Sequence, residues 1–219
     1  MNTYPKIDTV FKRDAANNFR TLIEGDWSQE AFGYLANNQW AFTEKVDGTN
    51  IRVMWDGATA TFGGKIDNAQ IPVKLLYSLR GYFDGTPKRF RMLEVFGGDG
   101  GVCLYGEGYG ASIQKVGTEY KSDGTDFVLF DVRVGEWWLE RDDVEDVGKK
   151  LGLQVVPVVG RGVLQDAVDY VRCNPKSHWN PSLVMEGLVM RPRVSLLTRS
   201  GRRIIAKIKG RDFDQGRRK

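Results

Sequence analysis

Histidine, cysteine and proline are scarce in this sequence of 219 residues, which contains one, two and seven of them respectively. The single histidine, His178, excludes a histidine-rich metal site or a triad built on histidine, and we assign it no role. Cys103 and Cys173 lie seventy residues apart with no partner motif. We therefore interpret both as reduced thiols rather than as a disulfide or a metal site.

Long apolar segments are also absent. No run approaches the roughly 20 apolar residues that a membrane-spanning helix needs. The N-terminal residues contain no apolar stretch of the signal-peptide type. We expect a cytoplasmic protein that is not associated with a membrane.

Glycine and charged residues are abundant. Twenty-six glycines indicate many tight turns, and 41% hydrophobic beside 27% charged residues suit a single globular domain over residues 1–219. The net charge of +4 is uneven, because residues 191–219 carry a net +9 and residues 1–190 a net −5. This asymmetry predicts a local surface that binds a polyanion. A basic tail that only aids solubility is the alternative.

The pattern of apolar residues predicts strands with helices inserted between them. Residues 40–62 are interpreted as a hairpin with its turn at Asp56-Gly57, and further strands are expected over 102–107, 127–134, 154–159, 183–192 and 203–209. One helix is expected to begin at Pro72, and a second has Thr86 as N-cap and ends at Gly97-Gly98. Two more are expected around 144–151 and over 163–172. The sequence therefore predicts an α+β fold built on antiparallel sheet.

The segment from Glu44 to Asn50 has the clearest chemical meaning, because it places a lysine, Lys45, just before an alternating strand. On its own it is equally compatible with a charged turn leading into a hairpin. Four further segments follow in order downstream, and each contains a carboxylate, an aromatic ring or lysines within an apolar strand. They are centred on Glu107, on Phe130-Asp131, on Glu186, and on Lys207 and Lys209.

Together and in this order, the five segments resemble the nucleotidyltransferase motifs of ATP-dependent DNA ligases, RNA ligases and mRNA capping enzymes. The resemblance extends from Lys45 to Lys209, about three quarters of the chain. It implies an ATP-grasp-like core of antiparallel β-sheets with flanking helices around a nucleotide cleft. It also implies ATP as the donor of AMP, with Mg²⁺ or Mn²⁺ as the metal.

The resemblance assigns the chemistry to three lysines and two acids. Lys45 would be the nucleophile that becomes a lysyl-adenylate, and Lys207 and Lys209 would supply a positive field around it. Asp47 and Glu186 would hold the hydrated metal ion.

It also implies a set of nucleotide contacts, each of which has an alternative. Phe130 would stack on adenine, but core packing explains an aromatic in an apolar strand equally well. Glu107 would contact the ribose or a metal-bound water, and alone it would be a turn carboxylate. Glu44 would help to read the base. The remaining expected nucleotide-binding residues are Val46, Asn50, Lys65, Glu186, Lys207 and Lys209.

Several nearby residues are expected to have simpler roles. Asp131 would solvate a strand end, and Arg52, on the polar face of its strand, would be solvated. Trp137-Trp138 is interpreted as buried in the sheet, with base stacking as the alternative. Residues 110–117 would form either a loop near the nucleic acid or a simple hairpin turn.

Asn50 points to one branch of this superfamily. DNA ligases and capping enzymes carry arginine at this position, whereas asparagine is typical of the RNA ligase 2 branch. Residues 62–72 look like the next motif of phage-type relatives, which have arginine where this chain has Lys65. A lysine there offers a point charge instead of a bidentate fork, and a solvated lysine in a glycine-rich turn is the alternative.

The sequence therefore predicts an ATP-dependent RNA ligase that joins 5′-phosphate and 3′-OH ends through Lys45-AMP and an adenylated 5′-phosphate. RNA, including nicked RNA or an RNA–DNA duplex, is the expected partner. Only ten residues follow Lys209. We therefore expect a stand-alone, monomeric catalytic domain whose missing oligonucleotide-binding or helical domain could come from a partner protein. The alternatives are a DNA ligase, a GTP-dependent capping guanylyltransferase, and a silent nucleic-acid-binding module.

Overall fold

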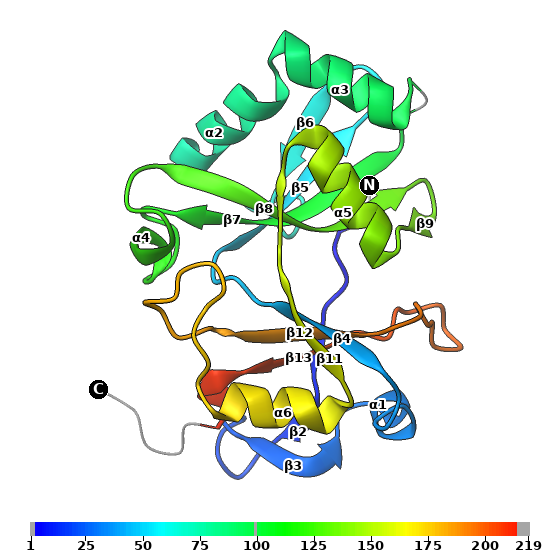
Figure 1. The fold of residues 1–219 in the computed structure, drawn as a ribbon, viewed down its shortest axis with the longest axis vertical. Coiled ribbons are helices and arrows are strands. Elements are labelled where there is room, and N and C mark those ends of the chain that lie inside the picture. Colours follow the sequence, from blue (N-terminus) through cyan, green and yellow to red (C-terminus); the bar gives the residue numbers. More distant parts are fainter. Residues whose placement is uncertain (1–2, 99, 214–219) are drawn as a thin grey trace. The chain divides into compact units, whose positions relative to one another are not determined.

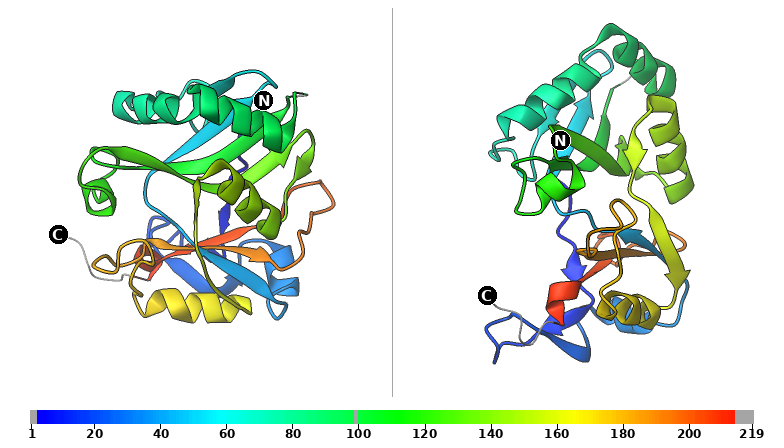
Figure 2. Two further views of the ribbon diagram at one scale, coloured as in Figure 1. Left: turned by 45° about the horizontal axis from the view of Figure 1, so that its top comes forward. Right: turned by 60° about the vertical axis from the view of Figure 1, so that its left-hand side comes forward.

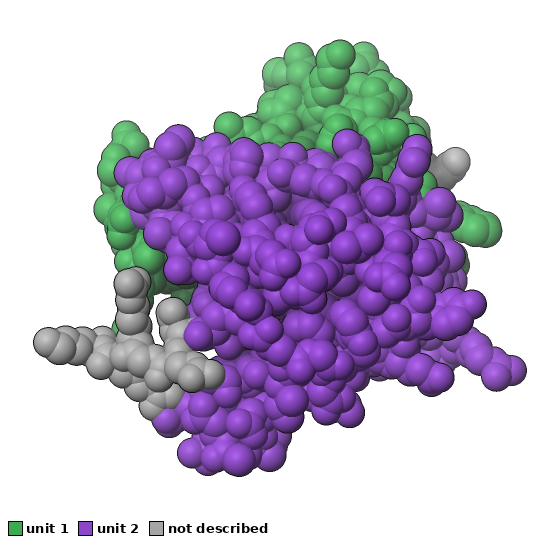
Figure 3. Space-filling model, turned by 60° about the horizontal axis from the view of Figure 1, so that its bottom comes forward, with its two compact units in different colours: residues 1–5, 47–156 green, residues 6–46, 157–219 purple. Residues whose placement is uncertain are grey.

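The computed structural model describes residues 3–98 and 100–213, and the chain divides into two compact units. Unit 1 comprises residues 1–5 and 47–156, and unit 2 comprises residues 6–46 and 157–219 (Figure 3). The chain passes from one unit to the other after Pro5, after Val46 and after Val156. That the two units form a single nucleotidyltransferase domain stays a prediction.

Unit 1 is built on a six-stranded sheet with strand order β10-β8-β7-β5-β6, and β9 pairs with β8 beside this path. Neighbouring strands are antiparallel except for β8 and β10, which are parallel. The strands are β5 (Thr49–Trp55), β6 (Ala60–Gly63), β7 (Val102–Gly110), β8 (Thr125–Val134), β9 (Trp137–Trp138) and β10 (Gln154–Val155).

Helices α2 (Val73–Phe83), α3 (Thr86–Phe96) and α5 (Arg141–Leu151) pack against one face of this sheet (Figures 1 and 2), and the short α4 (Gly117–Tyr120) follows β7. Their apolar residues join alternate residues of the strands in one core that includes Ile51, Val53, Leu75, Leu79, Leu104, Leu129, Val144 and Leu151. Gly106 and Gly108 lie on this helix-covered face, where a side chain would meet Phe127 or Leu75. The opposite face of the sheet is free of these helices and presents the residues discussed below.

Unit 2 contains a five-stranded sheet with order β1-β13-β12-β4-β11, of which only the β1–β13 pair is parallel. The strands are β1 (Asp8–Thr9), β4 (Trp40–Glu44), β11 (Val158–Gly162), β12 (Gly187–Pro192) and β13 (Ala206–Lys209). A separate hairpin pairs β2 (Phe11–Arg13) with β3 (Leu22–Trp27). Helices α1 (Glu30–Tyr34) and α6 (Leu164–Arg172) and the 3₁₀ turn η1 (Gly210–Asp212) complete the unit.

Most predicted elements are confirmed, as is the α+β class. The expected helices correspond to α2, α3, α5 and α6, with boundaries within a few residues, and Thr86 is the first residue of α3 rather than its cap. Val144, Val147, Gly148 and Leu151 are all buried, as their helical spacing indicates. Strands β12 and β13 begin later than expected, at Gly187 and Ala206.

Two predicted elements have wrong bounds, a hairpin and a strand, and both errors fall where the chain changes units. Only residues 49–63 form the expected hairpin, because β4 pairs with β11 and β12 in unit 2 instead. The predicted strand 154–159 is split at Pro157 into β10 of unit 1 and β11 of unit 2. Proline has no N–H group to continue a strand ladder, and the Pro157 carbonyl accepts from the Glu44 N–H at 3.1 Å.

The interpretations of the two tryptophans and of the two cysteines also have a structural outcome. Burial of Trp137 is wrong, because its side chain is 79% exposed, while Trp138 is half-buried. Cys103 and Cys173 are both free, as predicted, and burial raises the pKa of the Cys103 thiol. No helix within the described part of the chain is both long and apolar enough to cross a membrane.

Candidate active site

Lys45 follows directly after β4, at the point where that strand runs beside the start of β12. The backbone N–H of Lys45 donates to the Gly187 carbonyl at 2.9 Å, and Glu44 lies opposite Leu188 in the sheet register. This pairing brings Lys45 next to Glu186, and the Lys45 Nζ donates to Glu186 Oε2 at 2.6 Å. The structure therefore brings together two predicted site residues that are separated by 141 positions in sequence.

Lys209 reaches the same carboxylate from the other side. Gly187 and Lys209 are partners in the register of β12 and β13, and the Lys209 Nζ donates to Glu186 Oε1 at 2.5 Å. One carboxylate thus lies between two ammonium groups, and all three side chains are largely buried. We call Lys45, Glu186 and Lys209 the lysine–glutamate cluster.

Lys207 lies two residues before Lys209 on the same face of β13, and Ala206 and Ile208 are buried on the other face, as the alternation predicted. Residues two apart on a strand are separated by roughly 6.6 Å. Lys207 is therefore close enough along the strand to add positive charge near the cluster. A simple solvent-facing surface does not describe this face, since both lysines are partly buried.

Glu44 points to the opposite side of β4 from Lys45 and is only 2% exposed. Its carboxylate accepts from Ser177 Oγ at 2.5 Å and from the backbone N–H of His178 at 2.8 Å. Ser177 Oγ in turn accepts from the backbone N–H groups of Trp179 and Asn180. Glu44 therefore anchors the turn at residues 177–180, and its predicted contact with the base stays a prediction.

Sequence reasoning missed Ser177. A signal was present, because the alternation of β4 places Glu44 on the same side as the buried Trp40 and Phe42. A carboxylate in such a position needs polar partners.

In unit 1, three predicted nucleotide-binding residues share the helix-free face of the sheet. Asn50 on β5 lies opposite Glu107 on β7, and Glu107 lies opposite Val128 on β8. Directly paired residues of antiparallel strands project to the same face. Phe130 lies two residues beyond Val128 and joins this face. Glu107 is in the middle of β7, so its interpretation as a turn carboxylate is wrong.

A β-bulge sets the position of Phe130. Tyr105 pairs with Asp131 while the next residue of β7, Gly106, pairs with Leu129, which leaves Phe130 as the extra residue of β8. Bulges of this kind redirect a side chain and are frequent near active sites. Because of the bulge, Phe130 and Asp131 both lie on the helix-free side, while Leu129 and Val132 enter the core. Phe130 therefore lies outside the core on the helix-covered side, and its predicted stacking on adenine stays a prediction.

Tyr4 covers part of this face. Its hydroxyl donates to Asp131 Oδ2 at 2.9 Å, and its ring lies edge-on to Phe130 with 5.1 Å between the centroids. The ring also contacts Tyr105 and Trp138. Asp131 is fully buried, so its expected role in solvating a strand end is wrong. The sequence contained no signal that would have placed Tyr4 here.

Asn50 and Gln114 lie around the start of β5. Asn50 Oδ1 is buried and has no hydrogen-bond partner among the described residues. The Gln114 side chain donates to the Gly48 carbonyl at 3.1 Å, from a loop in which Ser112 and Gln114 have positive φ. Residues 110–117 are thus a loop tied to Gly48 within unit 1, rather than a simple hairpin turn.

Arg52 is 1% exposed, so its predicted solvation is wrong. Its guanidinium donates to the Gly64 carbonyl at 2.8 Å and to Asp67 Oδ1 at 2.7 Å. A side chain at Gly63 would meet this guanidinium at 2.9 Å. Arg52 therefore fixes the turn that carries Lys65, whose side chain is exposed.

Two other features bear on what the site can bind. Within the described residues, no three His, Cys, Asp or Glu side chains cluster as a metal site. Magnesium needs only one or two carboxylates beside water and phosphate oxygens. The two predicted metal ligands belong to different units, Asp47 to unit 1 and Glu186 to unit 2, and their binding of such a hydrated ion stays a prediction.

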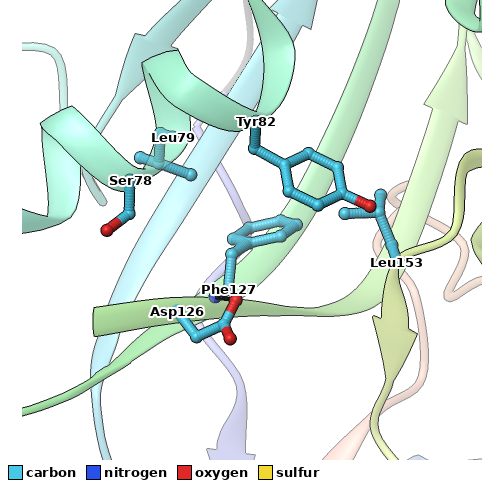
Figure 4. Close-up of a pocket in the computed structure, with 6 residues that line it drawn as sticks. All are labelled: Ser78, Leu79, Tyr82, Asp126, Phe127 and Leu153. Atoms are coloured by element: carbon cyan, nitrogen blue, oxygen red, sulfur yellow. Dashed lines mark hydrogen bonds between the residues drawn. The ribbon is translucent and has the colours of Figure 1, made fainter. Parts of the chain in front are cut away.

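A cavity in unit 1 lies on the helix-covered side of the sheet, between α2 and β8 (Figure 4). It measures only about 20 Å³ and is lined by Ser78, Leu79, Tyr82, Asp126, Phe127 and Leu153. A volume of this size holds about one water molecule, so this cavity is not a nucleotide site.

Comparison with known proteins gives one family and one set of similar structures. The profile of the RNA ligase family matches residues 38–209. An RNA ligase of Naegleria gruberi with pyrophosphate superimposes with a TM-score of 0.64 at 18% identity, over 95% of this chain and 58% of that one. A variant of the same enzyme with ATP and Mn gives a TM-score of 0.63 at 18% identity, over 95% and 57%. A search of curated proteins gave no match.

The likeness to these structures confirms the predicted fold of antiparallel sheets with flanking helices. The chain spans less than two thirds of the length of the enzymes it matches. The family profile covers most of the sequence, including every predicted site residue from Glu44 to Lys209. The chain therefore belongs to the RNA ligase family.

Proposed function

We propose that the protein is an ATP-dependent RNA ligase in which Lys45 is the nucleophile. The observation that carries the proposal is the lysine–glutamate cluster, in which the Lys45 Nζ lies 2.6 Å from Glu186 and a second lysine bonds the same carboxylate. Membership of the RNA ligase family supports it. The similar Naegleria enzyme has been solved with ATP and Mn, which supports ATP and a divalent metal ion for this chain.

In the first step, neutral Lys45 attacks the α-phosphorus of ATP. A P–N bond forms, the attacking nitrogen releases a proton to solvent, the bond between the α-phosphorus and the bridging oxygen breaks, and pyrophosphate leaves. The ordinary pKa of a lysine side chain is about 10.4, so the neutral amine costs about 4.6 kcal/mol at neutral pH. Glu186 stabilises the ammonium form, so the Lys45–Glu186 hydrogen bond must open before the attack. Lys209 keeps the Glu186 charge paired when that happens.

Two transfers follow from the lysyl-adenylate. A 5′-phosphate oxygen attacks the adenylate phosphorus, the P–N bond breaks, and Lys45 regains a proton. A 3′-OH then loses its proton and attacks the 5′-phosphorus, which forms the phosphodiester and releases AMP. Lys207 and Lys209 would stabilise the negative charge that develops on the phosphates. A divalent ion at Asp47 and Glu186 would neutralise further phosphate charge.

Nucleotide recognition is proposed for the helix-free face of unit 1. Asn50 Oδ1 is a buried acceptor without a donor, an arrangement that costs about 1–3 kcal/mol unless a donor arrives. A ribose hydroxyl is such a donor, and Glu107 lies opposite Asn50 in the sheet. Phe130 offers a ring for the adenine. Glu44 and Val46 are both buried, so any part they take in nucleotide binding would be through backbone atoms.

The test is transfer of label from α-labelled ATP to the protein in the presence of Mg²⁺. Wild type should retain label after denaturation, Lys45→Ala should not, and Lys149→Ala, which removes an exposed lysine of α5, should behave as wild type. GTP tested in parallel should give no label. Absence of label on wild type, or equal label on Lys45→Ala, would refute the proposal.

The acceptor is tested with nicked duplexes that differ only in ribose or deoxyribose at the 3′-OH side. Preferential sealing of the ribose substrate is expected of an RNA ligase. Preference for the deoxyribose substrate would identify a DNA ligase with the same chemistry. RNA binding without label on Lys45 would identify a silent binding module.

A further inference from the structure

Residues 193–205, which connect β12 to β13, form a projecting hairpin that we call the arm. Leu197 and Arg203 form a bridge, and Ile204 donates to the Leu196 carbonyl at 2.9 Å. The tip is closed by Thr198 and Gly201, whose N–H donates to the Thr198 carbonyl, and Gly201 has φ of +77°. The arm extends past the ends of both strands (Figures 1 and 2). The arm therefore has a defined conformation that its own hydrogen bonds stabilise.

The arm is basic and has no acid of its own. It carries four arginines, and no aspartate or glutamate occurs from Gly187 to Arg211. Arg202 pairs with Asp8 at 3.4 Å, but Arg193 and Arg199 are exposed and form no ion pair with the described residues. Val194 and Leu197 are 67% and 60% exposed between these arginines. Positive charge and apolar surface thus occupy the same projection.

We propose that the arm is a docking surface for the phosphate backbone of the RNA substrate, away from the reacting end. This inference rests on the proposed function. Arginine matches phosphate geometry with a planar, bidentate fork, and two arginines without carboxylate partners favour a polyanion. Val194 and Leu197 would contact the sugar and base surface of a strand whose phosphates bind Arg193 and Arg199.

The position of the arm sets a length requirement. Glu186 precedes the first residue of β12, and the arm follows its last residue, so the six residues of β12 separate the arm from the lysine–glutamate cluster. At ~3.3 Å per residue this is roughly 20 Å. A stacked strand advances about 3.4 Å per nucleotide. The strand must therefore extend about six nucleotides from the reacting end before it reaches the arm and the arm contributes to binding.

The experiment uses the full chain with Arg193 and Arg199 both changed to glutamine. Both side chains are exposed, so the variant should keep the wild-type melting temperature. Arg80→Gln with Arg89→Gln, two exposed arginines of α2 and α3, is the matched control. Affinity for a labelled 24-nucleotide RNA is measured by anisotropy at several salt concentrations. Label transfer to Lys45 is measured in the same preparations, without RNA.

The arm variant should bind the RNA more weakly, and its plot of log affinity against log salt should be shallower by up to ~1.4, since each single-strand phosphate contact contributes ~0.7. Sealing of strands longer than about six nucleotides should decrease, and that of shorter strands should not. Label transfer should match wild type. The control variant should match wild type throughout.

Wild-type affinity and an unchanged salt slope in the arm variant would overturn the inference, and would leave the arm as a surface for a protein partner. The proposed function has a separate failure, the absence of label on wild-type Lys45. If that occurs while RNA binding still depends on Arg193 and Arg199, the arm remains a nucleic-acid docking surface and only the ligase chemistry is refuted.

Discussion

The Lys45 ammonium donates to the Glu186 carboxylate at 2.6 Å, so the proposed nucleophile is held in its charged form by the residue also proposed as a metal ligand. This pairing stabilises the resting protein and opposes the attack on ATP. The amine is released when this hydrogen bond opens, and Glu186 would then be available to hold a divalent ion that neutralises phosphate charge. The same carboxylate would then act at two stages of the first step.

Glu186→Gln should separate these effects. The change removes a charge that favours the Lys45 ammonium and leaves the Lys209 ammonium nearby, so both effects favour the neutral amine. The acid limb of label transfer should therefore move to lower pH. The maximal rate should fall, because a proposed metal ligand is lost. Loss of a hydrogen bond to a charged group should also cost about 1.5–3 kcal/mol of folding stability.

The measurement for Glu186→Gln is label transfer across a pH series. Thermal melting is recorded on the same samples. Glu94→Gln, at an exposed position of α3 in unit 1, is the matched control. An unmoved acid limb would show that Glu186 does not control the charge of Lys45, and would leave metal binding and stability as its roles.

The pairing of Arg52 with Asp67 predicts a pH dependence of stability. The Arg52 guanidinium beside Asp67 holds the pKa of that carboxyl below its usual value of 3.8. A carboxyl whose pKa is lower in the folded state contributes stability above its ordinary pKa, and this contribution is lost as the pH falls through the folded value. Asp67→Asn should therefore lower the melting temperature near neutral pH, and the difference from wild type should disappear in acid.

Melting curves from about pH 7 down to about pH 3 would test this linkage. Asp123→Asn, which removes an exposed aspartate that forms no ion pair with the described residues, is the matched control. A difference between wild type and Asp67→Asn that stays constant over the whole series would contradict the assigned pairing.

Local patterns were sufficient to predict much of the fold and part of the site. Helix α5 follows from its apolar spacing and from Gly152, which ends it in the left-handed conformation at φ +64°. The face shared by Lys207 and Lys209 follows from period-two alternation. Both features depend only on residues that are close in the sequence, so the sequence alone predicts them.

The errors concern relations between distant residues. Alternation placed Arg52 on a solvated face, but it could not show that the 64–67 turn folds over that face and covers the guanidinium. The bulge at Phe130 shifts the alternation of β8 by one residue. Asp131 therefore lies on the helix-free side of the sheet, whereas strict alternation would place it with Leu129 on the helix-covered side. The pairing of Glu186 with Lys45 and Lys209 depends on the register of three strands, which no local pattern encodes.

Gly106 should tolerate no side chain. A Cβ atom there would lie 2.3 Å from the Phe127 ring and 2.4 Å from the Val128 carbonyl oxygen, and the backbone atom cannot rotate away. Gly106→Ala should therefore destabilise the protein by about 1–3 kcal/mol or more. Gly81, in helix α2, has open space around it, so Gly81→Ala should stabilise by about 0.5–1 kcal/mol. Denaturant unfolding of both variants provides the comparison, and equal effects would contradict the packing described for β7.

Tyr4 should act on Asp131 and on Phe130 through different parts of its side chain. Tyr4→Phe removes the hydrogen bond to Asp131 and keeps the ring, so it should cost about 1.5–3 kcal/mol of stability. The apparent affinity for ATP in label transfer should not change. Tyr4→Leu also removes the edge-on contact with Phe130, and the proposed adenine platform loses its support. The apparent KM for ATP should then rise as well.

A double-mutant cycle with Asp131→Asn isolates the polar part of this arrangement. Tyr4 and Asp131 are in direct contact, so their effects on stability should not add, and the coupling should be of the order of 0.5–3 kcal/mol. Tyr82→Phe is the matched control, because it also removes a hydroxyl hydrogen bond, to the Leu151 carbonyl, on the helix-covered side of the sheet, and its effect should add to that of Asp131→Asn. Additive effects of Tyr4→Phe and Asp131→Asn would contradict the hydrogen bond. An unchanged KM for ATP in Tyr4→Leu would show that Phe130 keeps its position without Tyr4, and the N-terminal segment would then contribute to stability alone.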